Sequence, residues 1–452
     1  MTTYPQTAVI TPAHAQQFHD HFQADPKNRV ARNAVTKNNI HAVATNRDVV
    51  AGTDHTFSHT LHSNEITAQK ASGRCWVFAG LNLFRVTAME KLGLEKFELS
   101  QTYAMFWDKI EKSNFFLESI IRTADEPVDG RLLTHLLKDP IQDGGQWDMF
   151  VNLIKKYGVV PKSVMPEAES STNSRYMNWL ITAKLREFAA ELRRMHANGA
   201  TETTLRTLKV EMMAVIYRMT AIHLGEPPQS FEWQWRDKDG TFHRDGRLTP
   251  QEFYQRYSPY NLDDMACLIH CPTPDKPFNA LYTIDYLGNV VEGDIIRYLN
   301  VEMDVFKQTA VEMIKAGKPV WFGCDVGKML ERDLGIMDTH TYDYELLYGT
   351  PFTADKTERV MYGHSVMTHA MVFTGVDLDD NGRATKWRVE NSWGDAFGEK
   401  GYMVMSDAWF NEYMYEIAVD KQYVPAELLP ILETEPTRLP PWDPMGALAA
   451  AG

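Results

Sequence analysis

The stretch Gln69-Lys-Ala-Ser-Gly-Arg-Cys75-Trp76 stands directly before a helical pattern and decides how the rest of the chain is interpreted. Apolar residues after it recur at spacings of four, three, four and four, at Val77, Leu81, Phe84, Ala88 and Leu92. Gly93 follows as a candidate C-terminal cap, and Ser72 is a candidate N-cap. The pattern therefore predicts a helix that carries Cys75 in its first turn.

A cysteine in that place has a physical route to ionisation. The thiolate is the nucleophilic form of a thiol, and the positive end of a helix dipole stabilises it. Gln69 can point its amide N–H at an oxyanion, beside the backbone N–H of Cys75. A small residue packed at a helix start explains the same stretch about equally well, so this motif alone leaves catalysis open.

Two later stretches supply the partners that such a cysteine needs. His369 lies in the apolar strand pattern of residues 367–373, and Asn391 and Trp393 lie in Glu390-Asn-Ser-Trp-Gly394. An Asn oxygen can accept from an imidazole N–H and fix the orientation and tautomer of the ring, and a neighbouring Trp can keep water from that bond. A lone His among apolar residues is more often structural than catalytic, so these motifs carry weight only in combination.

The combination resembles the papain-like cysteine peptidases. Gln69 precedes Cys75 by six residues, as in that family, and Cys75-Trp76 and Asn391-Ser-Trp-Gly394 match its signatures. The separation of Cys75 and His369 is 294 residues, about twice the roughly 130–150 of the secreted members. An insertion of about 150 residues is therefore expected between them.

The chain is more specifically similar to the aminopeptidase C and bleomycin hydrolase family. Six ordered stretches resemble it: residues 69–76, 143–149, 156–161, 323–328, 369–377 and 442–448. One departure is Ala68, where the family usually has Asn before the Gln. The resemblance covers nearly the whole chain.

This resemblance implies an α+β, papain-like two-lobe cysteine peptidase fold with a large helical insertion and an extended C-terminal arm. We expect five parts: an N-terminal extension (1–60), a helical lobe with the nucleophile (61–165), a mainly helical insertion for oligomerisation (166–275), a β-rich lobe with His369 and Asn391 (276–420), and a Pro-rich arm in the cleft (421–452).

The same resemblance implies an aminopeptidase that removes N-terminal residues from peptides through a thioester on Cys75, with His369 as base, Asn391 as its orienting group and Gln69 at the oxyanion. Gly144 and Gly145 are expected to pair with an extended substrate, since Gly has no Cβ. Trp393 is expected at the substrate site.

The resemblance also implies a role for the end of the arm, at Ala449, Ala450, Ala451 and Gly452. Its carboxylate is expected to meet the α-amine of the substrate, and the arm is expected to block substrate residues before the cleaved one, so that single N-terminal residues are removed. The arm is slightly longer than the usual family terminus, so self-trimming of Gly452 is a hypothesis. Family members form homohexamers and need no metal or organic cofactor.

The sequence pattern gives an independent outline of the chain. It predicts a helix near Pro12–Phe22 with a polar, loop-like stretch after it, two long helices broken at Asn198-Gly199, and a hairpin turning at Asp239-Gly240. Strand patterns dominate after Lys318. The last 32 residues contain six prolines, which predicts an extended arm with neither helix nor central strand. Helices first and strands last favour the α+β class.

Composition limits the partners and the cellular location that can be expected for the protein. There are 46 Lys and Arg against 60 Asp and Glu, and the net charge of −14 disfavours nucleic acid as a partner. The first residues lack the features of a secretory signal, and no apolar run is long enough to span a membrane. We take the four cysteines as reduced and the location as cytoplasmic. Cys267 and Cys271 flank His270, but no second cluster offers zinc ligands, so no metal is assigned.

Two other functions remain open at this point. The same Cys-His-Asn set can transfer an acyl group to an amine instead of water. The chain can also act as a nucleic-acid-binding hexameric assembly, although its charge weighs against this. The preferred N-terminal residue and the physiological substrate are not encoded in any motif.

Overall fold

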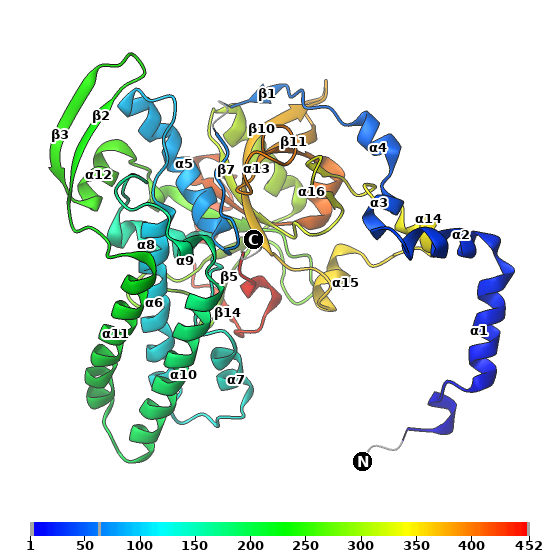
Figure 1. Cartoon of the computed structure of the whole chain (residues 1–452), viewed down its shortest axis with the longest axis horizontal. Helices are drawn as coiled ribbons and strands as arrows, with labels where there is room; N and C mark the ends of the chain where they lie inside the picture. Colours follow the sequence, from blue (N-terminus) through cyan, green and yellow to red (C-terminus); the bar gives the residue numbers. More distant parts are fainter. Residues whose placement is uncertain (1–3, 62–64, 450–452) are drawn as a thin grey trace.

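The computed structural model describes residues 4–61 and 65–449 and places a helical half beside a β-rich half (Figure 1). The helical half contains α5 (Cys75–Leu92), α6 (Gln101–Arg122), α7 (Arg131–Lys138), α8 (Trp147–Tyr157), α9 (Glu169–Thr172), α10 (Arg175–Ala197), α11 (Glu202–Leu224) and α12 (Pro250–Tyr257). α5 is buried along most of its length, since it packs against the sheet on one side and against α6, α8 and α12 on the others.

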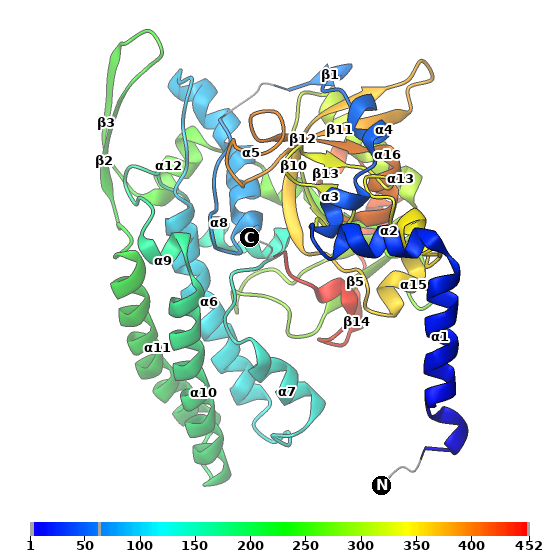
Figure 2. The ribbon, with the colours of Figure 1, turned by 45° about the vertical axis from the view of Figure 1, so that its right-hand side comes forward.

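The long helices α6, α10 and α11 lie side by side and extend away from the sheet (Figures 1 and 2). The predicted break between α10 and α11 is confirmed, and Gly199 there takes a φ of 86°, which favours glycine. The predicted hairpin is also confirmed as β2 (Phe231–Arg236) and β3 (Phe242–Leu248). Thr249 then caps α12 with Pro250 at its first position.

The β-rich half is built on one large sheet with the strand order β14-β5-β6-β4-β13-β7-β10-β11-β12-β9-β8, and β1 pairs with β10 outside this path. Its strands are β1 (His59–Thr60), β4 (Met265–Ile269), β5 (Ala280–Ile284), β6 (Tyr298–Asn300), β7 (Val320–Cys324), β8 (Leu330–Glu331), β9 (Ile336–Met337), β10 (His369–Leu378), β11 (Ala384–Glu390), β12 (Tyr402–Ser406), β13 (Met414–Asp420) and β14 (Thr437–Leu439). The strands predicted after Lys318 are confirmed.

The central strand β10 has both faces covered, which explains why it is apolar at nearly every position. Ala370 and Val372 face α5 and belong to the core between the two halves. Met371 and Phe373 alternate with them and pack in a second core with α13 (Met303–Lys315) and α16 (Asp407–Tyr413). His369, the first residue of β10, thus sits at the end of a rigid strand beside α5.

The N-terminal segment differs from the prediction. Helix α1 (Pro12–Ala24) is where it was expected, but the loop-like stretch after it forms α2 (Pro26–Val35), α3 (Ile40–Ala44) and α4 (Arg47–Gly52). The polar residues that suggested a loop act as N-caps: Asp25, Asn39 and Asn46 accept from backbone N–H groups of the helices that follow them. The short helices α14 (Tyr344–Tyr348) and α15 (Lys356–Met361) lie on the same side of the molecule (Figure 1).

The C-terminal arm also differs in one respect. It contains a one-turn helix, α17 (Leu429–Leu432), although a helix was excluded there; Pro430 sits in its first turn, where no backbone donor is needed. The rest is extended, with β14 at the edge of the sheet beside β5, and the turn η4 (Pro444–Gly446) near its end. The arm finishes between the helical half and the sheet (Figure 1). Among the described helices, none has the length and apolar character to cross a membrane.

Candidate active site

Cys75 is the first residue of α5 and is completely buried between the two halves. Its place in the first turn is confirmed, but the predicted N-cap is wrong, because Arg74 holds that position. Ser72 instead donates its hydroxyl to Gln69 O (2.7 Å) and accepts from Arg74 Nε (2.9 Å). Ser72 therefore shapes the loop before the helix rather than capping it.

The surroundings of the Cys75 thiol act on its ionisation in opposite directions. Burial raises the pKa of Cys75 to about 12, while hydrogen bonds from the backbone of Ala370 and Trp76 favour the thiolate. The contact with Ala370 places the thiol beside the residue that follows His369. In this closed, water-free position the thiol is neutral at neutral pH unless a nearby base takes its proton.

His369 and Asn391 are joined by a buried hydrogen bond of 2.9 Å between Nε2 and Oδ1. Asn391 Oδ1 also accepts from the backbone N–H of Ser392 at 2.7 Å, and this fixes which end of the amide faces the imidazole. Because Oδ1 is an acceptor only, Nε2 must carry the proton. The neutral ring therefore has its basic lone pair on Nδ1.

Gln69 is held at both ends of its side-chain amide. Ser392 Oγ donates to Oε1 at 2.6 Å, and Nε2 donates to Ser72 O at 2.6 Å. The backbone N–H of Gln69 donates to Ser392 O. These bonds tie the loop before Cys75 to the turn after Asn391, so residues more than 300 positions apart in the chain are fixed to one another.

Trp393 lies against the imidazole, with 5.0 Å between the ring centroids of His369 and Trp393. The Arg332 guanidinium also lies over the indole, 4.4 Å from a Trp393 ring centroid. The indole thus covers the His369–Asn391 pair on one side, as the sequence predicts.

The loop of Gly144 and Gly145 is held in place by Asp143, a residue that sequence reasoning did not select. Its carboxylate accepts from Gly73 N (2.9 Å), Lys109 Nζ (2.6 Å) and Asn178 Nδ2 (2.7 Å), and its backbone oxygen accepts from Trp76 Nε1 (2.6 Å). Burial by itself raises the pKa of Asp143, but the Lys109 charge and these hydrogen bonds hold that pKa below its ordinary value. In the sequence, Asp143 is one acidic residue before two glycines, and this pattern does not indicate that Asp143 links the loop to the start of α5.

Gly145 has two reasons to lack a side chain. A Cβ there would lie 2.5 Å from the Trp76 ring, and its backbone pairs with another chain segment. Gly144 lies beside it, and its carbonyl accepts from Lys112 Nζ at 2.6 Å.

The segment that pairs with Gly145 is the C-terminal arm. Gly145 N donates to Ala449 O and Ala449 N donates to Gly145 O, both at 3.2 Å, in an antiparallel bridge. Gln146 Nε2 also donates to Ala447 O. Ala449 is thus brought to the site, whereas Ala450, Ala451 and Gly452 lie outside the described residues. The end of the arm thus takes the position of a short strand beside Gly145.

One of the chain's other three cysteines neighbours the site, because Cys324 pairs with His369 across β7 and β10. Cys267 and Cys271 flank His270 on and after β4, and Cys324 lies at the end of β7; all three are buried thiols. Among the residues described, no group of three or more His, Cys, Asp and Glu has the geometry of a metal site.

A buried acidic cluster lies under the arm. Glu416 on β13 and Asp148 on α8 approach Cys267, and burial raises the pKa of Glu416 to about 8 and that of Asp148 to about 6. Within the described part of the chain, Glu416 Oε1 has no hydrogen-bond partner. Glu416 is therefore protonated at neutral pH in the folded protein.

This cluster predicts a pH-dependent stability. Glu416 holds its proton more tightly in the folded protein than in the unfolded chain, where the carboxyl pKa is near 4.5. Its stabilising contribution is therefore full below pH 4.5 and is lost as the pH rises to about 8. In Glu416→Gln the group does not titrate, so we expect the Tm difference, variant minus natural protein, to rise by several degrees between pH 5 and pH 8.

Thermal unfolding at the two pH values checks this prediction. The exposed Glu232→Gln on β2 is the matched control and should show the same Tm difference at both. A Glu416→Gln difference that does not change with pH would contradict the burial argument.

The fold and the site together define a cysteine peptidase of the papain-like, α+β class: a buried thiol at a helix start lies beside β10, whose first residue, His369, is hydrogen-bonded to Asn391 just after β11. Comparison with known proteins agrees. The model of the Peptidase C1-like family matches residues 9–446, and the chain belongs to that family.

Individual relatives show which members of the family the chain resembles. The chain is 46% identical over 437 residues to bleomycin hydrolase of Mus musculus, covering 95% of this chain and 96% of that protein. It is 47% identical over 440 residues to aminopeptidase C of Listeria innocua, covering 97% and 99%. The crystal structure of PepW from Lactobacillus rhamnosis HN001 matches with a TM-score of 0.96 and 49% identity, covering 98% of this chain and 100% of that one. The expected aminopeptidase C and bleomycin hydrolase family is thereby confirmed, and the protein is a cysteine aminopeptidase.

Proposed function

We propose that the enzyme removes single N-terminal residues from peptides, with Cys75, His369 and Asn391 as the catalytic set and the C-terminal arm as the element that limits cleavage to one residue. The observation that carries this proposal is the two-way hydrogen bonding of Gly145 and Ala449. An arm in that position blocks the path that any residues preceding the cleaved N-terminal residue would follow, and it leaves the path of the departing amine open.

The reaction begins with a proton transfer. His369 Nδ1 takes the proton of Cys75, which burial otherwise keeps on sulfur, and the thiolate attacks the first peptide carbonyl carbon. The imidazolium then gives its proton to the departing amine as the C–N bond breaks, and the acyl group remains on Sγ as a thioester.

Hydrolysis of the thioester completes the cycle. Neutral His369 takes a proton from water, the resulting hydroxide attacks the thioester carbonyl, and the C–S bond breaks to release the amino acid. In both steps Gln69 and the backbone N–H of Cys75 stabilise the oxyanion. The fixed Gln69 amide supports this role, because a preorganised donor does not have to reorient as charge develops.

A free α-amine is the feature that the substrate needs in this proposal. The end of the arm, Ala450 to Gly452, would present a carboxylate to that amine, and an ion pair in a narrow cleft is screened less than one in bulk water. Cytoplasmic location and assembly as a homohexamer stay predictions.

A matched pair of substrates tests the function. One chromogenic amino-acid amide is compared with its N-acetylated form in reducing buffer. We expect cleavage of the free amine only, since the acetyl group removes the positive charge and collides with the arm. Equal kcat/KM for both forms would show a cysteine peptidase whose arm does not select N-termini.

A further inference from the structure

The last turn of the arm is fastened by a buried ion pair. Lys276 Nζ lies 3.0 Å from Asp443 Oδ2, and the two side chains are only 4% and 8% exposed. The other oxygen of Asp443 accepts from Met445 N at 3.0 Å and so caps the turn η4. One carboxylate therefore both shapes this turn and attaches it to the body of the protein.

Lys276 belongs to a rigid part of the molecule. It lies in the segment between β4 and β5, and Asn300, at the end of β6, donates to Lys276 O (2.9 Å) and to Cys271 O (3.0 Å). Asn300 also accepts from Cys271 N at 2.9 Å. These bonds fix the segment to the sheet, so the ammonium group cannot follow the arm if the arm moves.

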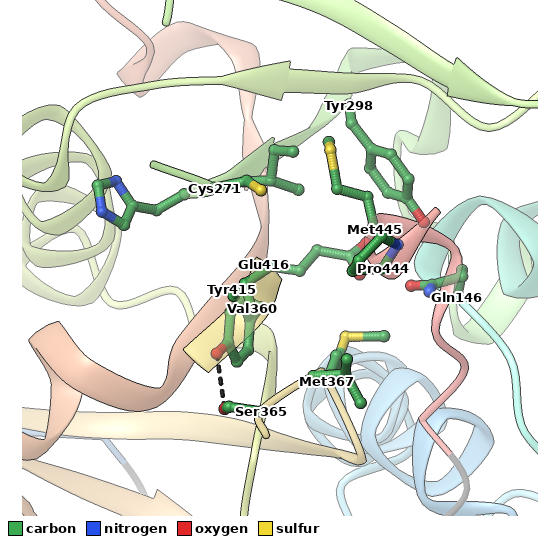
Figure 3. A pocket seen from close by; sticks show the side chains of 13 residues that line it. Gln146, Cys271, Tyr298, Val360, Ser365, Met367, Tyr415, Glu416, Pro444 and Met445 are labelled. Atoms are coloured by element: carbon green, nitrogen blue, oxygen red, sulfur yellow. Dashed lines mark hydrogen bonds between the residues drawn. The ribbon is translucent and has the colours of Figure 1, made fainter. Parts of the chain in front are cut away.

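The turn determines where the arm goes next. Beyond η4 the chain meets Gln146 through Ala447 and Gly145 through Ala449. Figure 3 shows Pro444 and Met445 lying in the pocket that Gln146, Cys271 and Glu416 line, with the Glu416 side chain extending toward them. The turn thus forms one wall of a pocket that Gln146, Cys271 and Glu416 also line, and the residues after it run to the loop beside Cys75.

Apart from the contacts of Ala447 and Ala449 with the loop beside Cys75, the arm is attached upstream of the turn. β14 pairs with β5 only as far as Leu439, and Pro440 and Pro441 follow it. The Trp442 ring contacts the Arg131 guanidinium at 3.9 Å, but Trp442 itself is partly exposed. In the stretch from Trp442 to Ala447, the buried Lys276–Asp443 ion pair is the main contact that attaches the arm to the body of the protein.

We propose that the Asp443–Lys276 ion pair is the latch that holds the arm in the cleft and so restricts the enzyme to free N-termini. This inference rests on the proposed function, because it assumes that the arm selects the substrate. Lys276 and Asp443 are positioning residues: they set the place of the arm and touch no reacting atom. Loss of either charge frees the arm and admits substrates with a blocked amine.

The two single variants are expected to release the arm to different extents. Lys276→Met leaves Asp443 as a buried carboxylate without its cation, which favours release of the turn into water. Asp443→Asn keeps an oxygen for the Met445 N–H, and Lys276 retains Asp275 at 2.8 Å, a side chain that is 65% exposed. Lys276→Met should therefore have the larger effect.

The measurement is the ratio of kcat/KM for the acetylated amide to kcat/KM for the free amine. We expect it to rise by about tenfold or more in Lys276→Met and by less in Asp443→Asn. The KM of the free-amine substrate should rise while its kcat stays close to that of the natural enzyme. The control is Arg438→Gln, which breaks the exposed Arg438–Asp285 pair on β14 of the same arm and should leave the ratio unchanged.

The outcomes separate the two proposals. If the natural enzyme cleaves both amides equally, the proposed function fails. If it discriminates and both latch variants discriminate as well as it does, the latch is wrong. If Lys276→Met does not fold, the ratio measured for Asp443→Asn, which keeps the capping hydrogen bond to Met445, tests the latch. A ratio that rises equally in Arg438→Gln would assign the effect to the arm in general and would also overturn the latch.

Discussion

Cys75→Ala is expected to lower kcat/KM for the free-amine amide by about 10⁵-fold or more, because it removes the sulfur atom proposed to attack the carbonyl. The variant should keep its fold. An alanine at the first position of α5 preserves the helix, and the buried side chain loses one sulfur atom. Binding of substrate should therefore survive while thioester formation is lost.

The control for this variant is Cys324→Ala. Cys324 is as fully buried as Cys75 and pairs with His369 across β7 and β10, but it packs with Phe322 and Met371 in the second core, so the variant removes a sulfur atom near the site without removing Cys75. It should cost some stability and keep activity within about tenfold of the natural enzyme. Steady-state kinetics of both variants, with circular dichroism to check folding, makes the comparison. Substantial activity in Cys75→Ala would remove the thiol from the mechanism.

His369→Ala is expected to lower kcat/KM by about 10⁴-fold or more, and it should also change the shape of the pH profile. Without the imidazole, burial keeps the proton on the Cys75 thiol, whose pKa is raised to about 12. Below that pKa the thiolate fraction grows about tenfold for each pH unit. The residual rate should therefore climb with pH across the range 6 to 9, where the natural enzyme is expected to reach a plateau.

Rates measured across that pH range check the prediction. His196→Ala on α10, far from the thiol in the fold, is the control and should keep the natural profile. A flat profile in His369→Ala would mean that another group takes the thiol proton, and the assignment of His369 as base would be wrong.

Local pattern was sufficient for most of the secondary structure. The helix after Cys75, the break at Asn198-Gly199 and the strand that starts at His369 follow from the spacing of apolar residues and from where glycine interrupts it. The predictions were wrong where a residue type can serve two structural roles. Asp25, Asn39 and Asn46 were taken as loop residues but cap helices, and Pro430 was taken to exclude a helix but lies in the first turn of one.

The sequence by itself determined the class of enzyme and the identity of the thiol, the imidazole and the amide, because these residue types stand in recognisable local motifs. Only the tertiary structure decided how they are held. Asp143 fastens the Gly145 loop to the start of α5, Ser392 fixes the Gln69 amide, and Lys276 anchors Asp443 of the arm. Each of these contacts joins residues that are tens to hundreds of positions apart in the chain. A side chain that acts across such a distance leaves no periodicity or spacing of its own, since its partner is chosen by the packing of the two halves.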